Sequence, residues 1–226
     1  MTQSSSFPLL KHPAFRGLSD ASASTLERVC NVLRFELGGQ LCDPNDIPAR
    51  ILFILQGQAR LISRHNGRLT TVGKFGPGSV IGAASLLSGA PCENVIAAEE
   101  VIACAISDEL CRDLYSLENT FRHWCDQQLW PQELLNVLEA LEQNTPEANS
   151  SALEKLEDAL QTAERCSPDP AAVDAALAAG KLLYVTSAWG DLTVGQPVRS
   201  SVDLPDCKPF SLRLVSLPAP GFSDQG

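Results

Sequence analysis

The sequence predicts a mainly β fold with added helices: a β-barrel or jelly roll flanked by helices, followed by a small α+β unit. Three observations lead to this prediction. Short strand-like runs fill residues 35–106, helical segments follow up to residue 144, and the remainder mixes capped helices with strand-like runs. We therefore expect an N-terminal segment (residues 1–22), a barrel domain with a helical lid (23–145) and an α+β unit that ends in a linker (146–226).

The barrel domain should begin with a short helix over residues 24–33, capped by Ser24 or a neighbour. Asn66-Gly67 predicts a hairpin turn, because both residues tolerate positive φ. Many short strands at close spacing are typical of a barrel or jelly roll. The strand-like runs cover residues 51–55, 59–62, 69–72, 95–98 and 101–106.

Helices return after the strands. Ser107 opens the first, a second runs over residues 118–129, and Pro131 suits the first turn of a third. Within the third helix, Leu134, Leu138 and Leu141 share one side, which predicts either core packing or a homodimer formed through the lid helices.

The α+β unit carries clear helix-end signals. Ser151 and Glu154 form a capping box, and the helix opened by Asp169-Pro170 should end at Gly180 in a left-handed cap. Three strand-like runs follow, over residues 182–188, 194–198 and 210–217.

Charge and hydropathy exclude several classes of protein. The net charge is −10, with −5 in residues 1–143 and −5 in residues 144–226, so we expect no nucleic-acid partner. No apolar run of about 18 residues is present, which argues against direct membrane insertion. Residues 1–10 also lack the pattern of a secretory signal. We expect a cytoplasmic protein that reaches a membrane only through a partner or a longer chain.

The cysteines and histidines form no recognisable reactive site. No pair of the eight cysteines has C-x-x-C spacing, and we interpret them as buried reduced thiols. No histidine shares a motif with a nucleophile, so we expect no enzyme. A zinc site can be drawn, although its spacing fits no common pattern, from Cys104, Cys111, His123 and Cys125.

Residues 75–95, called the cradle below, have the build of a phosphate-binding segment. A glycine-punctuated strand end is followed by a single helical turn and then by a loop into the next strand. Backbone amides at such a turn attract anions. However, no Lys or Arg lies between Lys74 and Arg112. The shape indicates a ligand pocket, whereas the charge argues against an ordinary phosphate site.

Three motifs within residues 12–143 resemble the cyclic nucleotide-binding domain family: Asp43-Pro44-Asn45-Asp46, the hairpin at residues 53–61, and the glycine-rich run at residues 75–82. The resemblance implies a jelly roll whose last helices swing onto the pocket when ligand binds. In that family a glutamate holds the ribose and an arginine pairs with the cyclic phosphate. Here Ala83 stands at the glutamate position, and Glu93 brings a negative charge near the phosphate position.

The resemblance therefore implies a vestigial pocket without a resident cofactor, in which a cyclic nucleotide binds weakly or not at all. A neutral ligand held by Ser85, Cys92 and Asn94 stays open as an alternative. The candidate ligand-binding residues are Gly82, Ala83, Ala84, Ser85, Cys92, Glu93 and Asn94.

The runs at residues 182–188, 194–198 and 211–218 resemble a region of certain bacterial ATP-binding-cassette exporters, between a degenerate nucleotide-binding domain and the membrane part. This resemblance implies a protein partner in a secretion system. We expect a non-catalytic regulatory or interaction module. The alternative is a working sensor of cyclic AMP or cyclic GMP with unusual contacts.

Overall fold

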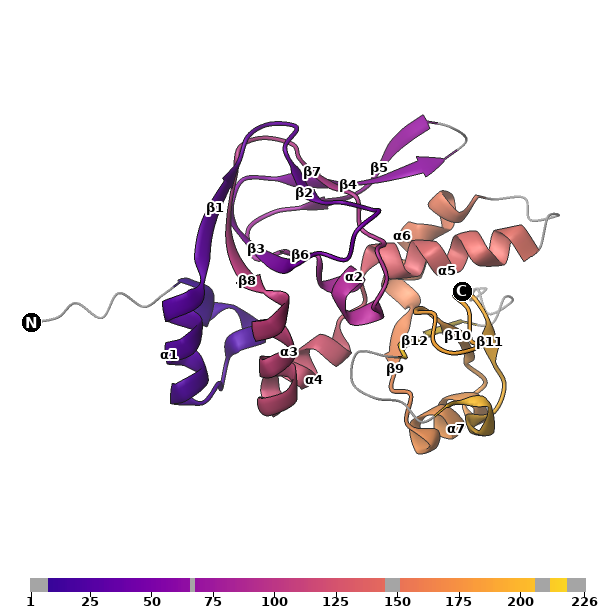
Figure 1. Ribbon diagram of the computed structural model, residues 1–226. Helices are drawn as coiled ribbons and strands as arrows, with labels where there is room; N and C mark the ends of the chain where they lie inside the picture. Colours follow the sequence, from indigo (N-terminus) through magenta and orange to yellow (C-terminus); the bar gives the residue numbers. More distant parts are fainter. Residues whose placement is uncertain (1–7, 66–67, 145–150, 206–211, 219–226) are drawn as a thin grey trace, which may run out of the picture. The chain divides into compact units, whose positions relative to one another are not determined.

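The structure is a computed structural model that describes residues 8–65, 68–144, 151–205 and 212–218. It divides into two compact units (Figure 1). The first holds residues 1–86 and 91–127, and the second holds residues 87–90 and 128–226. The predicted hairpin turn at Asn66-Gly67 and the C-terminal tail beyond residue 218 lie outside the described residues.

The described residues of the first unit form eight strands in two antiparallel sheets (Figure 1). One sheet has the order β1-β8-β3-β6 and the other has the order β2-β7-β4-β5. This arrangement confirms the predicted jelly roll. The strands are β1 (Asn31–Phe35), β2 (Gln40–Cys42), β3 (Arg50–Gln56), β4 (Ala59–His65), β5 (Arg68–Phe75), β6 (Val80–Ile81), β7 (Val95–Ala97) and β8 (Val101–Ser107).

The core of the first unit combines apolar side chains from both sheets. Leu52 and Ile54 of β3 belong to one buried cluster with Leu61 of β4 and Val95 of β7. Because alternate residues of a strand point to the same face, each sheet contributes one apolar face to this core.

Helix α1 (Asp20–Val29) differs from its prediction. The sequence predicts the helix over residues 24–33 with Ser24 or a neighbour as its cap, but Ser19 is the N-cap and accepts a hydrogen bond from the backbone N–H of Ser22. Cys30 ends the helix. Residues 31–35 form β1 instead, because their backbone pairs with β8 over the whole length of the strand.

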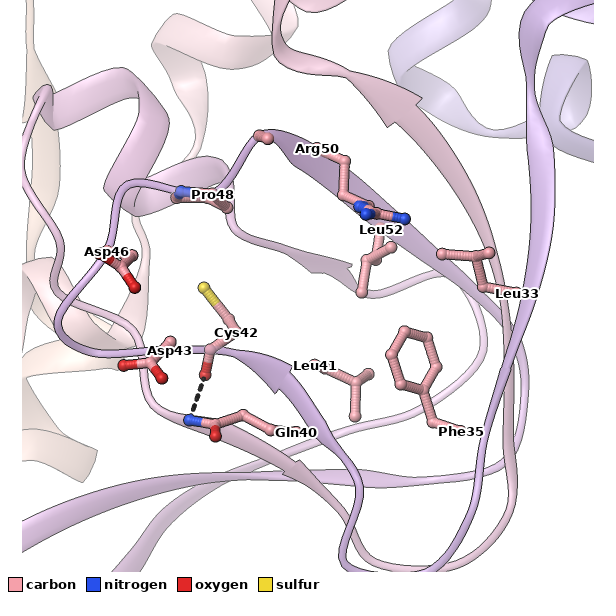
Figure 2. A pocket seen from close by; sticks show the side chains of 11 residues that line it. Leu33, Phe35, Gln40, Leu41, Cys42, Asp43, Asp46, Pro48, Arg50 and Leu52 are labelled. Atoms are coloured by element: carbon pink, nitrogen blue, oxygen red, sulfur yellow. Dashed lines mark hydrogen bonds between the residues drawn. The ribbon is translucent and has the colours of Figure 1, made fainter.

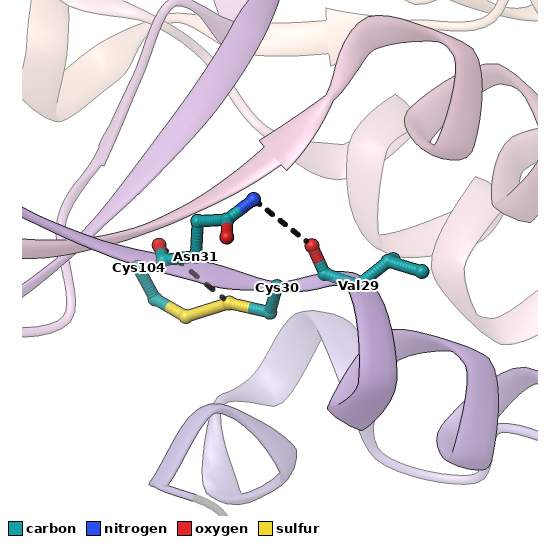
Figure 3. The surroundings of a disulfide bond; sticks show 4 residues. All are labelled: Val29, Cys30, Asn31 and Cys104. Carbon is teal, nitrogen blue, oxygen red and sulfur yellow. Dashed lines mark hydrogen bonds between the residues drawn. A yellow bond between two sulfur atoms is a disulfide. The ribbon is translucent and has the colours of Figure 1, made fainter.

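Cys30 and Cys104 form a disulfide, which corrects the expectation of reduced thiols for these two residues (Figure 3). Their Cα atoms are 6.4 Å apart, and 74 residues of sequence separate them. The bridge joins the end of α1 to β8 beside the β1–β8 ladder.

The short 3-10 helices at Pro8–Lys11 and Pro13–Phe15 are held by an aromatic cluster. The His12 ring packs edge-on against Phe53 and Trp124, and Phe15 stacks on Phe121. Three further helices belong to or border the first unit: α2 (Ala83–Ser88), α3 (Asp108–Leu117) and α4 (Asn119–Gln127).

The second unit contains the predicted α+β elements. Its helices α5 (Pro131–Asn144), α6 (Ala152–Thr162) and α7 (Pro170–Ala178) begin as expected, with the Ser151 capping box and the Asp169 cap in place. Its antiparallel sheet has the order β11-β10-β12-β9. These strands are β9 (Glu164–Cys166), β10 (Leu182–Val185), β11 (Pro197–Val198) and β12 (Leu214–Leu217).

A buried ion pair links α5 to the segment that leads into β12. Glu133 is 1 % exposed, and its carboxylate accepts hydrogen bonds from Nε and Nη2 of Arg213, which is 4 % exposed. Arg213 Nη2 also donates to the carbonyl oxygen of Gln128. The compact units divide at residues 127/128, so the second unit includes α5, which the sequence assigns to the lid of a domain ending at residue 145.

Among the described residues, no helix is both long enough and apolar enough to cross a membrane.

Candidate functional site

The predicted helical turn of the cradle follows directly from β6. Gly82 connects β6 to α2 with φ +87°, a conformation that side chains with a Cβ rarely adopt. A Cβ at this position would lie 3.1 Å from Pro48 Cγ and 3.2 Å from the carbonyl oxygen of Arg50. Glycine therefore lets the chain turn against this wall and begin α2 at Ala83.

Glu93 sits inside the cradle as a ligand of its backbone amides. Its side chain is 2 % exposed. The backbone N–H of Gly82 donates to Oε1 at 3.2 Å, and that of Ser85 donates to Oε2 at 3.0 Å. Hydrogen bonds from backbone amides stabilise a carboxylate, as they would an external anion. The negative charge that Glu93 brings to this segment is therefore held by two backbone hydrogen bonds.

Ser85 fixes the loop that carries this carboxylate. Its buried hydroxyl oxygen accepts from the backbone N–H of Cys92 and of Glu93, each at 3.2 Å. The hydroxyl also lies 3.4 Å from Cys92 Sγ. These contacts hold the loop at residues 92–93 over the start of α2.

The remaining predicted site residues surround this arrangement. Ala83 and Ala84 are buried in the first turn of α2. Asn94 is half-buried, and its carbonyl oxygen accepts from the backbone N–H of Ile62 at 2.8 Å. The structure thus brings together the predicted residues of α2 and of the loop that precedes β7.

A pocket of about 460 Å³ lies in the first unit beside the cradle (Figure 2). Asp43 and Asp46 stand at one end, and Leu33, Phe35 and Leu41 stand at the other. Pro48 and Arg50 line it as well, and these residues form the wall against Gly82. The volume is in the range of small-molecule sites, which hold about 300–1,000 Å³.

Cys42 links the pocket to the cradle. Its side chain lines the pocket, and burial together with the nearby charge of Glu93 raises the pKa of its thiol to about 12. A hydrogen bond with Ser85 acts in the opposite direction. A thiol with this pKa is protonated at neutral pH, so Cys42 contributes a small, weakly polar surface rather than a nucleophile.

Arg50 is the cation that sequence reasoning missed. The segment between Lys74 and Arg112 holds no cation, but Arg50 comes from the start of β3 and lines the pocket from there. One feature of the sequence could have pointed to Arg50: it begins the strand that follows the turn Asp43-Pro44-Asn45-Asp46. That turn brings β3 beside β6 and the cradle.

The structure does not bring together the zinc site that the sequence allowed one to draw, from Cys104, Cys111, His123 and Cys125. Among the described residues no group of three metal-binding side chains lies together, and Cys104 is bonded to Cys30. Cys111 is buried, and burial raises the pKa of its thiol to about 12.

Comparison with known proteins relates a part of the first unit to a family model. Residues 32–117 match the family model described as cyclic nucleotide-binding domain, which confirms the predicted family for this part of the chain. No curated protein matches the chain.

Solved structures of similar domains match at low identity. A cyclic nucleotide-binding domain from Methylobacillus flagellatus is 21% identical with a TM-score of 0.41, over 47% of this chain and 61% of that one. The guanosine-bound regulatory subunit of a cAMP-independent protein kinase A from Trypanosoma cruzi is 18% identical with a TM-score of 0.40, over 51% of this chain and 45% of that one. The chain therefore spans less than half of the trypanosomal subunit.

The N-terminal domain of a transcriptional regulator from Streptomyces coelicolor is 20% identical with a TM-score of 0.43. That match covers 67% of this chain and 94% of the other.

Proposed function

We propose that the cyclic nucleotide-binding domain at residues 32–117 acts as a non-catalytic regulatory or interaction module. In this proposal the chain's own Glu93 occupies the position that the phosphate of a nucleotide would take. The observation that carries this proposal is the pair of hydrogen bonds from the Gly82 and Ser85 amides to the Glu93 carboxylate. These are the donors that a glycine-rich cradle offers to an anion.

An external phosphate would have to displace a buried carboxylate from these amides. The displaced carboxylate would need new hydrogen bonds, because a buried charge without them is costly. The segment between Lys74 and Arg112 supplies no cation to attract the phosphate in exchange. Charge-assisted bonds contribute roughly 1.5–3 kcal/mol each, so the loss of one such bond weakens binding by about one to two powers of ten. Ala83, which cannot accept a hydrogen bond from a ribose hydroxyl, weakens it further.

The partner in this proposal is a protein. The similarity of residues 182–188 and 194–198 to a region of ATP-binding-cassette exporters indicates a secretion transporter as the class of partner. The domain would then act by contact with that partner and without chemistry of its own.

A second candidate function is a working cyclic-nucleotide sensor with unusual contacts. One observation favours it: Arg50 lines the pocket next to the cradle, so a cation is present although it comes from a different strand. In this alternative Arg50 replaces the family's arginine, and Glu93 moves away when the nucleotide enters.

Thermal unfolding with millimolar cyclic AMP and cyclic GMP separates the two candidates. A ligand at about 100 times its dissociation constant adds roughly 2.7 kcal/mol to stability, which is a shift of several degrees. We expect no shift for the unmodified protein and a shift for the double variant Ala83→Glu/Glu93→Arg. The Glu99→Ala variant, which removes an exposed carboxylate between β7 and β8, is the matched control and should behave like the unmodified protein.

A shift of the unmodified protein with either nucleotide would establish the sensor and overturn the proposal. If Arg50→Gln abolished that shift, Arg50 would be the replacement cation. Absence of a shift in the double variant would contradict the idea that Glu93 and Ala83 are what keep the nucleotide out.

A further inference from the structure

The second unit contains a groove of about 790 Å³ between the end of α5, the end of α7 and strands β10 and β11. It is separate from the pocket beside the cradle, and every residue that lines it belongs to the second unit. Leu141 of α5 and Leu177 of α7 give it apolar walls. We propose that this groove, called the basic groove below, binds a small organic anion with an apolar body.

The charge of the groove carries the first step of the argument. Lys181 and Arg199 line it, and they are the only charged side chains among the described residues that do so. The chain as a whole has a net charge of −10. Electrostatic attraction falls with distance, so the two nearby positive charges act on an anion in the groove more strongly than the distant negative charges of the chain.

The second step concerns unused hydrogen-bonding groups. Within the described ranges, no side-chain hydrogen bond or ion pair engages Arg199, Tyr184 or Asn144. Lys181 bonds to Glu164, an exposed carboxylate that does not line the groove. A guanidinium and a phenol beside an apolar surface can hold a carboxylate or sulfonate head. Apolar walls with a few polar groups are typical of small-molecule sites.

The third step is that the groove is built on rigid backbone. Gly195 has φ +80°, and a Cβ there would lie 2.5 Å from Ala140 Cβ, so the segment before β11 packs closely on α5. Gly180 ends α7 in a left-handed cap, with the Lys181 amide donating to the Ala176 carbonyl oxygen at 3.1 Å. Preformed walls lower the entropic cost of binding.

Titration of the full chain with 8-anilinonaphthalene-1-sulfonate tests the proposal, followed by displacement with dodecanoate and, as an uncharged comparison, dodecanol. We expect saturable binding at one site and displacement by dodecanoate at much lower concentration than by dodecanol. The double variant Lys181→Gln/Arg199→Gln should weaken binding at least tenfold. Lys155→Gln on α6 removes one positive charge away from the groove and should leave affinity unchanged.

Leu177→Trp tests the apolar body independently of charge, because the larger side chain fills the groove and should reduce binding. Circular dichroism of each variant separates loss of the site from loss of the fold. Binding that is unchanged in both the double variant and Leu177→Trp, or equal displacement by dodecanol and dodecanoate, would overturn the proposal. Absence of any binding to the unmodified protein would overturn it as well.

Discussion

The two units each bury a glutamate, and they hold it with different partners. Glu93 of the first unit receives hydrogen bonds from two backbone amides at the start of a helical turn. Glu133 of the second unit receives them from the guanidinium of Arg213. Backbone amides bind any anion of suitable size. An external anion could therefore use the amides of Gly82 and Ser85 only if Glu93 left them. The Arg213 guanidinium carries a full charge, and besides Glu133 it bonds the carbonyl oxygen of Gln128. The difference is between a carboxylate held by backbone amides and a carboxylate held by a side-chain cation.

Arg213→Met should have the largest effect on stability. The substitution leaves Glu133 buried without its cation, and breaking a buried pair in this way costs about 3–5 kcal/mol. Urea unfolding measures the loss. The double variant Glu133→Leu/Arg213→Met should recover most of it, because two apolar side chains need no partner. A loss below about 1 kcal/mol in the single variant would mean that Glu133 is not dependent on Arg213.

Removal of the disulfide between Cys30 and Cys104 should destabilise the first unit by about 2–4 kcal/mol, because the bridge restricts a long loop in the unfolded chain. Hydrogen exchange of the Cys30→Ala/Cys104→Ala variant, resolved by peptide, measures the two units separately. We expect faster exchange in β1 and β8 and unchanged exchange in β10 and β12. Equal acceleration in both units would show that they unfold together, and the two glutamates could then not be compared as independent sites.

Glu93→Ala should destabilise the first unit by about 2 kcal/mol, because two buried amides lose their acceptor. Formate, which supplies a carboxylate of the missing size, should restore part of the lost thermal stability when added at tens of millimolar. The Glu99→Ala control should show neither effect. Equal stabilisation of the unmodified protein by formate would contradict the occupation of these amides by Glu93.

Acidification should have the smallest effect, and it acts through His12. Burial lowers the pKa of His12 below its ordinary value of 6.5, while the hydrogen bond to the Gly78 carbonyl oxygen opposes the shift. The folded state therefore prefers the neutral ring, and the unfolded state takes up the proton first as the pH falls. Stability contributed by neutral His12 is present above pH 6.5 and is lost below it.

Urea unfolding between pH 7.5 and about pH 5.5 measures this effect. In His12→Gln the part of the pH dependence that belongs to His12 should disappear, whereas His123→Gln should retain it. If His12→Gln and His123→Gln both lose stability with falling pH as the unmodified protein does, His12 does not contribute to the pH dependence of stability.

Local signals in the sequence were sufficient for many elements. The Ser151 capping box, the Asp169 cap and the Gly180 helix end lie where the sequence predicts them, because each acts through backbone groups within a few residues. The short, continuous apolar runs that form β3 and β8 are recognisable for the same reason. The first helix was misplaced because pairing with β8 draws residues 31–35 into a strand.

The strand-like runs and the helix-capping residues were enough to predict the jelly roll and the α+β elements. The sequence also shows directly that no cation lies between residues 74 and 112. Tertiary structure alone decided that Glu93 binds the amides of Gly82 and Ser85, that Arg50 reaches the pocket, and that Arg213 neutralises Glu133. Each of these contacts joins residues 8 to 80 positions apart or places a side chain in a cavity. Such contacts depend on how sheets and helices pack, whereas helix caps and strand patterns depend on neighbouring residues.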